Sequence, residues 1–171
     1  DVANSISEKL IYRHPHVYED KLELDENQVK LNWEKLKLKD GKKSVLEGVP
    51  KTLPPILKSM RIQQKASNVG FNWSNKIESK EKVNEELNEL DDEISSGNLE
   101  KINNEFGDVL FSLINYGKHI GVNPDSSLEK ANKRFIKRFK FVEKKMKLEN
   151  KTFENLSSFP FSFNSPINSF K

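Results

Sequence analysis

The sequence predicts an all-α protein: a four-helix-type bundle with an N-terminal helix and a charged linker before it. Apolar residues recur at intervals of three and four over several long segments, which is the period of an amphipathic helix. Charged residues are 32% of the 171 residues and apolar residues 35%, a balance that indicates a soluble, helix-rich chain. No stretch approaches the roughly 18 consecutive apolar residues of a transmembrane helix, so we expect no membrane partner.

Charge and cysteine content narrow the function classes further. The net charge is only +3, which gives no reason to expect a nucleic-acid partner. The chain has no cysteine, which excludes a disulfide framework and a zinc–thiolate site and is consistent with a cytoplasmic location. Because it begins at Asp1 without a methionine, we expect a fragment or a processed product.

Residues 1–48 are predicted to connect the main domain to an earlier domain. Helical spacing predicts a helix over residues 1–13, stopped by His14-Pro15-His16, and we assign residues 1–18 as the terminal helix of a preceding domain copy. This assignment is based on a short internal similarity, in which residues 9–13 align with residues 134–138 at an offset of 125. The His-x-His pair could bind a metal, although such pairs in loops are more often structural. Residues 19–48 read as a charged linker that carries one helix.

Residues 49–150 are predicted to form the main domain. Its helices are expected from Pro54 to about Ser67, from a cap at Ser79 to about Ser95, from Leu99 to Ile120, and from residues 123–125 onward. Trp73 lies in the loop after the first of these, where an aromatic ring either plugs the core or stacks on a base. After residue 150 no amphipathic period survives, so residues 151–171 are expected to be an irregular tail.

An acidic pattern carries the chemistry. Glu85-Glu86-Leu87-Asn88-Glu89 is followed by Glu105-Phe106-Gly107-Asp108 on the next helix. Residues three apart share a helix face, so Glu86 pairs with Glu89 and Glu105 with Asp108. A short linker favours antiparallel neighbours, in which four carboxylates converge and require a cation, with Mg²⁺ or Mn²⁺ suited to oxygen ligands. The alternative is two solvated acidic faces.

The apolar residues place these carboxylates at the border of the core. Two stripes are predicted to be buried: Val83, Leu87, Leu90 and Ile94 on one helix, and Ile102, Phe106, Val109, Leu113 and Ile120 on the other. Gly107, between the two acidic residues of the second helix, either permits close approach of a ligand or is a tolerated glycine.

Cationic residues accompany the acidic ones. Lys82 shares the face of Glu86 and could pair with it or reach a phosphate. Arg134, Arg138 and Lys145 flank the apolar stripe of the last helix, where they could grip an anionic ligand or remain ordinary solvated residues.

Several segments taken together resemble a known family. EELNE, EFGDVLFSLINYGKHIG, LEKANKRFIKRF and VGFNW are similar to the MazG nucleoside triphosphate pyrophosphohydrolases. The opening VANSISEKLIYRHPHVY resembles the segment that joins the tandem halves of the two-domain member, which identifies this chain with the C-terminal half. The likeness covers about residues 1–150, and a phenylalanine- and serine-containing tail replaces the family's usual tryptophan-containing end.

The resemblance implies an all-α dimeric enzyme that hydrolyses a nucleoside triphosphate to the monophosphate and pyrophosphate with Mg²⁺. It implies that Glu86, Glu89, Glu105 and Asp108 hold the metal, that Glu85 and Glu86 are catalytic, and that Lys82, Arg134 and Arg138 meet the triphosphate. Arg134 stands where the family commonly has a lysine. Nucleotide-pool housecleaning is the implied role.

Two other functions compete with the enzyme, of which the first remains as an alternative and the second is rejected. A non-catalytic helical dimerisation module would use the same helices with its carboxylates as surface residues. A di-iron carboxylate bundle needs Glu-x-x-His pairs, and no glutamate here has a histidine three residues on. The sequence does not indicate the base; Gln63, Gln64, Trp73 and Asn132 are the candidates to line its pocket.

Overall fold

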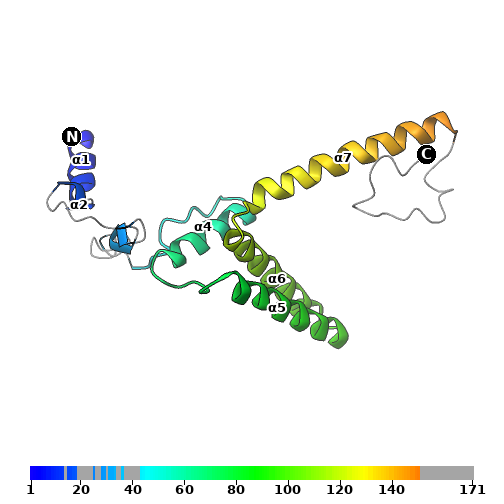
Figure 1. Cartoon of the computed structure of the whole chain (residues 1–171), viewed down its shortest axis with the longest axis horizontal. Helices are drawn as coiled ribbons and strands as arrows, with labels where there is room; N and C mark the ends of the chain where they lie inside the picture. Colours follow the sequence, from blue (N-terminus) through cyan, green and yellow to red (C-terminus); the bar gives the residue numbers. More distant parts are fainter. Residues whose placement is uncertain are drawn as a thin grey trace. The chain divides into compact units, whose positions relative to one another are not determined.

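Helices are the only regular elements in the part of the chain that the computed structural model describes, which confirms the all-α class. The described residues are 1–13, 15–18, 25, 28–29, 31–33, 36 and 43–150. The helices are α1 (Val2–Arg13), α2 (Pro15–Tyr18), α4 (Pro55–Ser67), α5 (Lys76–Ser96), α6 (Leu99–His119) and α7 (Pro124–Leu148) (Figure 1). None of the described helices is long and apolar enough to cross a bilayer.

Some predictions concern residues that the structure does not describe. The tail over 151–171, most of the linker helix and the His14–His16 side chains lie outside the described residues. The division into a terminal helix, linker, main domain and tail therefore stays a prediction.

Asparagines set the start of the two central helices. The Oδ1 atom of Asn75 accepts hydrogen bonds from the N–H groups of Ile77 and Glu78, at 2.8 and 3.1 Å. The Oδ1 atom of Asn98 does the same for α6. The predicted cap at Ser79 is wrong, because Asn75 satisfies the free N–H groups one turn earlier. Ser79 instead lies inside α5, 2% exposed, and its hydroxyl donates to the carbonyl of Lys76.

The two central helices form an antiparallel pair with α4 against one of them. α5 and α6 pack along their length and are joined only by Gly97 and Asn98 (Figure 1). Gly97 has a φ of 72°, the left-handed conformation that ends α5 and reverses the chain. α4 packs on α6, and the amide nitrogen of Gln63 donates to the carbonyl of Phe111 at 2.8 Å.

The buried face of the α5–α6 pair differs from the predicted stripe. On α5 the buried residues are Ser79, Val83, Glu86 and Leu90, whereas the predicted Leu87 and Ile94 are 43% and 54% exposed. On α6 they are Val109, Ser112, Asn115 and Gly117, and the predicted Phe106 and Leu113 are exposed. Polar side chains thus share the inner face with Val83, Leu90 and Val109, and several large apolar side chains remain on the outer face.

α7 belongs to a separate compact unit that begins at Asn123. Asn123 caps the helix by accepting from the N–H of Ser126, and Phe135 and Phe139 stack along it with ring centroids 5.9 Å apart. The described helices of the first unit supply three members of the expected bundle, and α7 as the fourth stays a prediction.

Candidate metal centre

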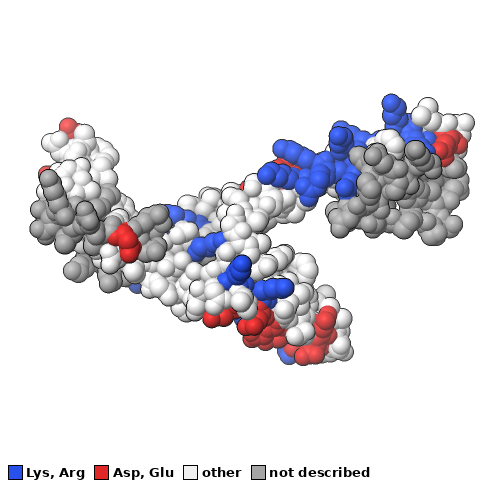
Figure 2. Space-filling model, in the orientation of Figure 1, with Lys and Arg blue, Asp and Glu red and all other residues white. Residues whose placement is uncertain are grey.

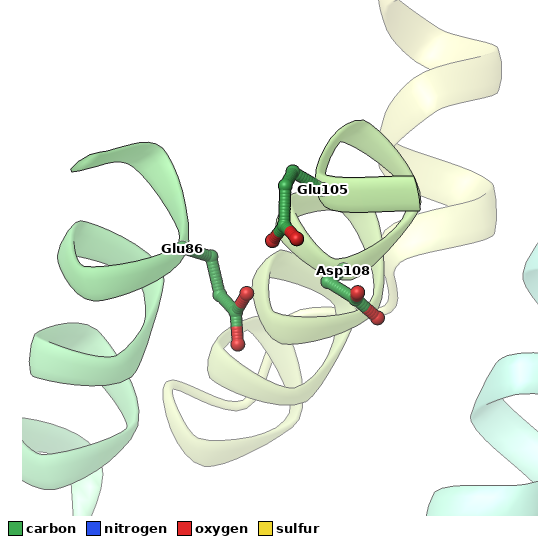
Figure 3. A group of neighbouring side chains, drawn as sticks. All are labelled: Glu86, Glu105 and Asp108. Atoms are coloured by element: carbon green, nitrogen blue, oxygen red, sulfur yellow. The ribbon is translucent and has the colours of Figure 1, made fainter. Parts of the chain in front are cut away.

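Three carboxylates from two helices come together on the α5–α6 pair. One oxygen from each of Glu86, Glu105 and Asp108 lies within 4.8 Å of the other two. Glu86 projects from α5 toward the two acidic side chains of α6 (Figure 3). We call these three residues the carboxylate cluster. Oxygen-only donors at this separation suit a hard divalent cation such as Mg²⁺ or Mn²⁺.

Their burial is graded from the core to the surface. Glu86 is 7% exposed because it takes an inward position of α5 between Val83 and Leu90. Glu105 is half-buried and Asp108 is exposed. A cation at the cluster would thus have one ligand on the protein side and an open side toward solvent, where a substrate could approach.

Lys82 forms ion pairs with two neighbouring glutamates of α5. Its Nζ atom lies 2.8 Å from an oxygen of Glu85 and 2.9 Å from an oxygen of Glu86. Hydrogen bonds to Glu85 and then to Glu86 raise the pKa of Lys82, so its ammonium stays charged. Lys82 therefore offsets part of the charge on Glu86, while Glu85 is half-exposed and outside the cluster.

No ion pair among the described residues compensates the charge of Glu105. Partial burial first, then repulsion from Glu89, Asp108, Glu86 and Glu93, raises the pKa of Glu105. A carboxylate whose charge is opposed by its neighbours is stabilised when a cation binds among them. The donor set is thus fitted to a divalent ion by its charge as well as by its spacing.

Glu93, near the turn between α5 and α6, is compensated by a lysine, and its pKa is shifted in the opposite direction. The Nζ atom of Lys101 lies 2.9 Å from Glu93, and the hydroxyl of Ser96 also donates to Glu93. These hydrogen bonds, from Lys101 first, lower the pKa of Glu93. Glu93 is satisfied by this chain alone and needs no cation.

The remaining predicted site residues fall in three places. Glu89 is exposed on α5 and is not among the three carboxylates that meet, although its charge acts on Glu105. Asn132, Arg134 and Arg138 lie on α7, the separate unit, along which the basic side chains gather in Figure 2. Figure 2 shows acidic side chains on the α5–α6 pair.

Trp73 lines an apolar pocket of about 300 Å³ between α4, α6 and the loops next to them. The other lining residues are Val45, Leu46, Ile62, Gln63, Ala66, Val69, Phe71, Phe111 and Asn115. The sequence pattern indicates Gln63 and Trp73 as pocket residues but misses Phe111 and Asn115. A signal was present, because Asn115 is a polar residue in an apolar run, seven residues from Asp108 on the same helix face.

Comparison with known proteins identifies the family of the domain that carries the cluster. The family model of the MazG nucleotide pyrophosphohydrolase domain matches residues 75–146, which include the whole cluster. The chain is 34% identical over 150 residues to the nucleoside triphosphate pyrophosphohydrolase of Escherichia coli K12, covering 84% of this chain and 57% of that protein. It is 38% identical over 159 residues to the nucleoside triphosphate pyrophosphohydrolase/pyrophosphatase MazG of Thermotoga maritima, covering 91% and 60%.

A third relative carries no function in its name. The chain is 39% identical over 161 residues to the uncharacterized protein YabN of Bacillus subtilis, covering 92% of this chain and 33% of that protein. The chain thus spans less than two thirds of each of these curated relatives.

Proposed function

The chain belongs to the MazG nucleotide pyrophosphohydrolase family, and from this premise we propose that it hydrolyses nucleoside triphosphates to the monophosphate and pyrophosphate. The observation that carries the proposal is the meeting of Glu86, Glu105 and Asp108 within 4.8 Å. Glu89, one helical turn after Glu86, is the proposed fourth ligand, which it becomes by turning its exposed side chain toward the cluster.

A divalent cation is the proposed cofactor, Mg²⁺ first and Mn²⁺ second. When bound, it would offset phosphate charge and lower the pKa of water. Burial first, and then repulsion from neighbouring carboxylates, raises the pKa of Glu105, and a bound cation would offset that repulsion.

Cationic side chains of the chain itself are proposed to meet the triphosphate. Lys82 is positioned by Glu85 and Glu86 at the edge of the cluster, where its ammonium can bind a phosphate oxygen. Its ion pair with Glu85 favours a supporting role for Glu85 over one in water activation. Arg134 and Arg138 would stabilise charge on the leaving pyrophosphate, and Asn132 and Trp73 would contact the nucleoside.

The proposed bond change is attack of water on the α-phosphorus. The bond from that phosphorus to the oxygen bridging to the β-phosphorus breaks, and pyrophosphate leaves. Hydrolysis in oxygen-18 water then labels the monophosphate. Label in the pyrophosphate instead would contradict the proposal.

We further propose that the chain works as a homodimer in the cytoplasm and cleans the nucleotide pool. Exposed apolar residues on α5 and α6 support self-association, since a lone helix pair would leave them in water. They include Leu87, Ile94, Phe106, Leu110 and Leu113.

The same exposed surface is the reason to keep a second candidate, a non-catalytic helical dimerisation module. The double variant Glu86→Ala/Asp108→Ala separates the two. For the enzyme, pyrophosphate release and Mg²⁺-dependent stabilisation are lost while the dimer, measured by light scattering, remains. A protein with no Mg²⁺ effect and no pyrophosphate release before mutation would be the dimerisation module.

A further inference from the structure

Two buried amides line the apolar pocket between α4 and α6 without using all their hydrogen-bonding atoms. Gln63 is 4% exposed and Asn115 is 3% exposed. The side-chain oxygens of both have no hydrogen-bond partner among the described residues. Buried polar atoms are nearly always paired, so two acceptors left unpaired by the described residues at one apolar pocket call for a donor from elsewhere, such as a ligand in the pocket.

The orientation of Gln63 is fixed by the fold. Its Nε2 atom donates to the carbonyl of Phe111 at 2.8 Å, and turning the amide over would set two oxygens against each other. Gln63 therefore offers an acceptor, and Asn115 on α6 presents its oxygen as a second one. A group with two N–H hydrogens is the natural partner for two acceptors.

The pocket lies on the same face of α6 as the cluster. Asp108, Phe111 and Asn115 are spaced by three and four residues, so their side chains project from one side of the helix. At 1.5 Å per residue, Asn115 is about 10 Å along the helix from Asp108. A ligand with its phosphates at Asp108 can thus extend toward Asn115.

Two aromatic side chains from one loop form part of the remaining wall. Phe71, 79% exposed, and Trp73 both line the pocket and come from the loop between α4 and α5. Stacking on an aromatic ring binds any base, because every base has a π-face, so it gives affinity without selection. Selection has to come from the amides.

We propose that this pocket binds the nucleobase of the substrate and that Gln63 and Asn115 select bases with an amino group on C6 of a purine or C4 of a pyrimidine. Adenine and cytosine offer two N–H hydrogens on that group. Hypoxanthine and uracil present a carbonyl oxygen at the same position, which two acceptors repel. The inference rests on the proposed function only for the placement of the phosphates.

Binding is tested first without any reaction. A Trp33→Phe variant of the whole chain leaves Trp73 as its one tryptophan, so the fluorescence reports the pocket. AMP and CMP are titrated against IMP and UMP, with ribose 5-phosphate as the probe that lacks a base. We expect AMP and CMP to change the fluorescence and to bind at least about tenfold more tightly than their carbonyl partners, since unpaired buried acceptors penalise the wrong base.

Two variants then assign the selection. Gln63→Met and Asn115→Leu are expected to bring the AMP/IMP and CMP/UMP affinity ratios close to one. Asn103→Leu, an exposed position on α6, is the matched control and is expected to keep both ratios. Phe71→Ala changes a side chain that is 79% exposed, and we expect it to weaken the binding of all four nucleotides equally.

The outcomes separate this inference from the proposed function. Equal affinity for amino and carbonyl bases, or no fluorescence change at millimolar nucleotide, overturns the pocket assignment even if the chain releases pyrophosphate from triphosphates. Discrimination that survives both Gln63→Met and Asn115→Leu overturns the role of the amides. If no triphosphate is hydrolysed but the monophosphates bind selectively, the pocket stands and the proposed activity falls.

Discussion

At the two ends of the α5–α6 pair, the surroundings of a glutamate shift its pKa in opposite directions. Near the turn, Glu93 faces Lys101 at 2.9 Å and its pKa is lowered. At the carboxylate cluster, Glu105 faces other carboxylates and its pKa is raised. Acidic residues at helical spacing are common, so their number says little. The difference lies in whether a lysine supplies the counter-charge directly: Lys101 does so for Glu93, whereas for Glu105 we propose that a divalent cation supplies it.

The largest effect is expected when Asp108→Asn is compared with Glu93→Gln, since both variants remove one negative charge but only the first changes the cluster. We expect Asp108→Asn to lower pyrophosphate release at least about 100-fold, because losing a group that merely supports a metal ligand already costs roughly 10–100-fold. Glu93→Gln is expected to stay near wild-type activity. Equal losses in the two variants, measured as kcat/KM at saturating Mg²⁺, would remove the distinction between the ends.

Thermal unfolding with Mg²⁺ gives the same comparison without substrate. At a concentration about 100 times the Kd, binding adds about 2.7 kcal/mol to the free energy of unfolding, which is roughly 5–10 °C in Tm for a chain of this size. The shift should vanish in Asp108→Asn and persist in Glu93→Gln. A Mg²⁺ shift retained in Asp108→Asn would place the ion elsewhere.

Lys82 belongs to both sides of the comparison, since it offsets the charge of Glu86 in the cluster and is also proposed to bind a phosphate group. Lys82→Met should lower kcat about 100-fold if its ammonium stabilises charge on the phosphates. The same change should tighten Mg²⁺ binding to the free protein about two- to fivefold, the size of a partly exposed ion pair. Lys80→Met, on an exposed part of α5, is the control. Weaker Mg²⁺ binding in Lys82→Met would show that Lys82 supports the site only structurally.

Two glycines extend the comparison to the backbone. Gly97 at the turn has a φ of 72°, so Gly97→Ala should lower the free energy of unfolding by about 1 kcal/mol. Gly107 at the cluster is helical, and an added Cβ there would meet nothing within 4 Å, so Gly107→Ala should raise it by about 1 kcal/mol. Urea unfolding measures both. If Gly107→Ala instead abolishes nucleotide binding, a ligand approaches the helix at that point.

The smallest expected effect is in the pH dependence of stability without metal. The lowered pKa of Glu93 means that its stabilising contribution is present above the pKa of the unfolded chain and is lost as pH falls through the folded pKa. The raised pKa of Glu105 means that its contribution is present below the unfolded pKa and is lost as pH rises through the folded pKa. At neutral pH, Glu93→Gln should therefore lower Tm and Glu105→Gln should raise it. Shifts of the same sign would contradict the assigned causes.

Local signals in the sequence are enough for the helices. The period of apolar residues, the proline at the start of α4 and α7 and the glycine after α5 predict elements close to those observed. The start of α5 lies one turn before the predicted cap, because Asn75 and Ser79 are both good capping residues. Sequence preference alone cannot tell which of two caps is used.

The inner face of the α5–α6 pair is less predictable. The pattern places Leu87 on the buried stripe, yet the structure buries Glu86 and leaves Leu87 43% exposed. Periodicity gives the width of an apolar face but does not say what covers it. A face predicted to be buried and found exposed is what a second copy of the chain would explain.

Local sequence is enough to predict the class of fold and the spacing that puts Glu105 and Asp108 on one face of α6, because both depend on residues within a few turns of each other. Only the tertiary structure decided that Glu86 joins them while Glu89 does not, and that Gln63 and Asn115 share a pocket. Those pairings join residues from different helices, whose rotation about their axes is set by packing and not by local sequence.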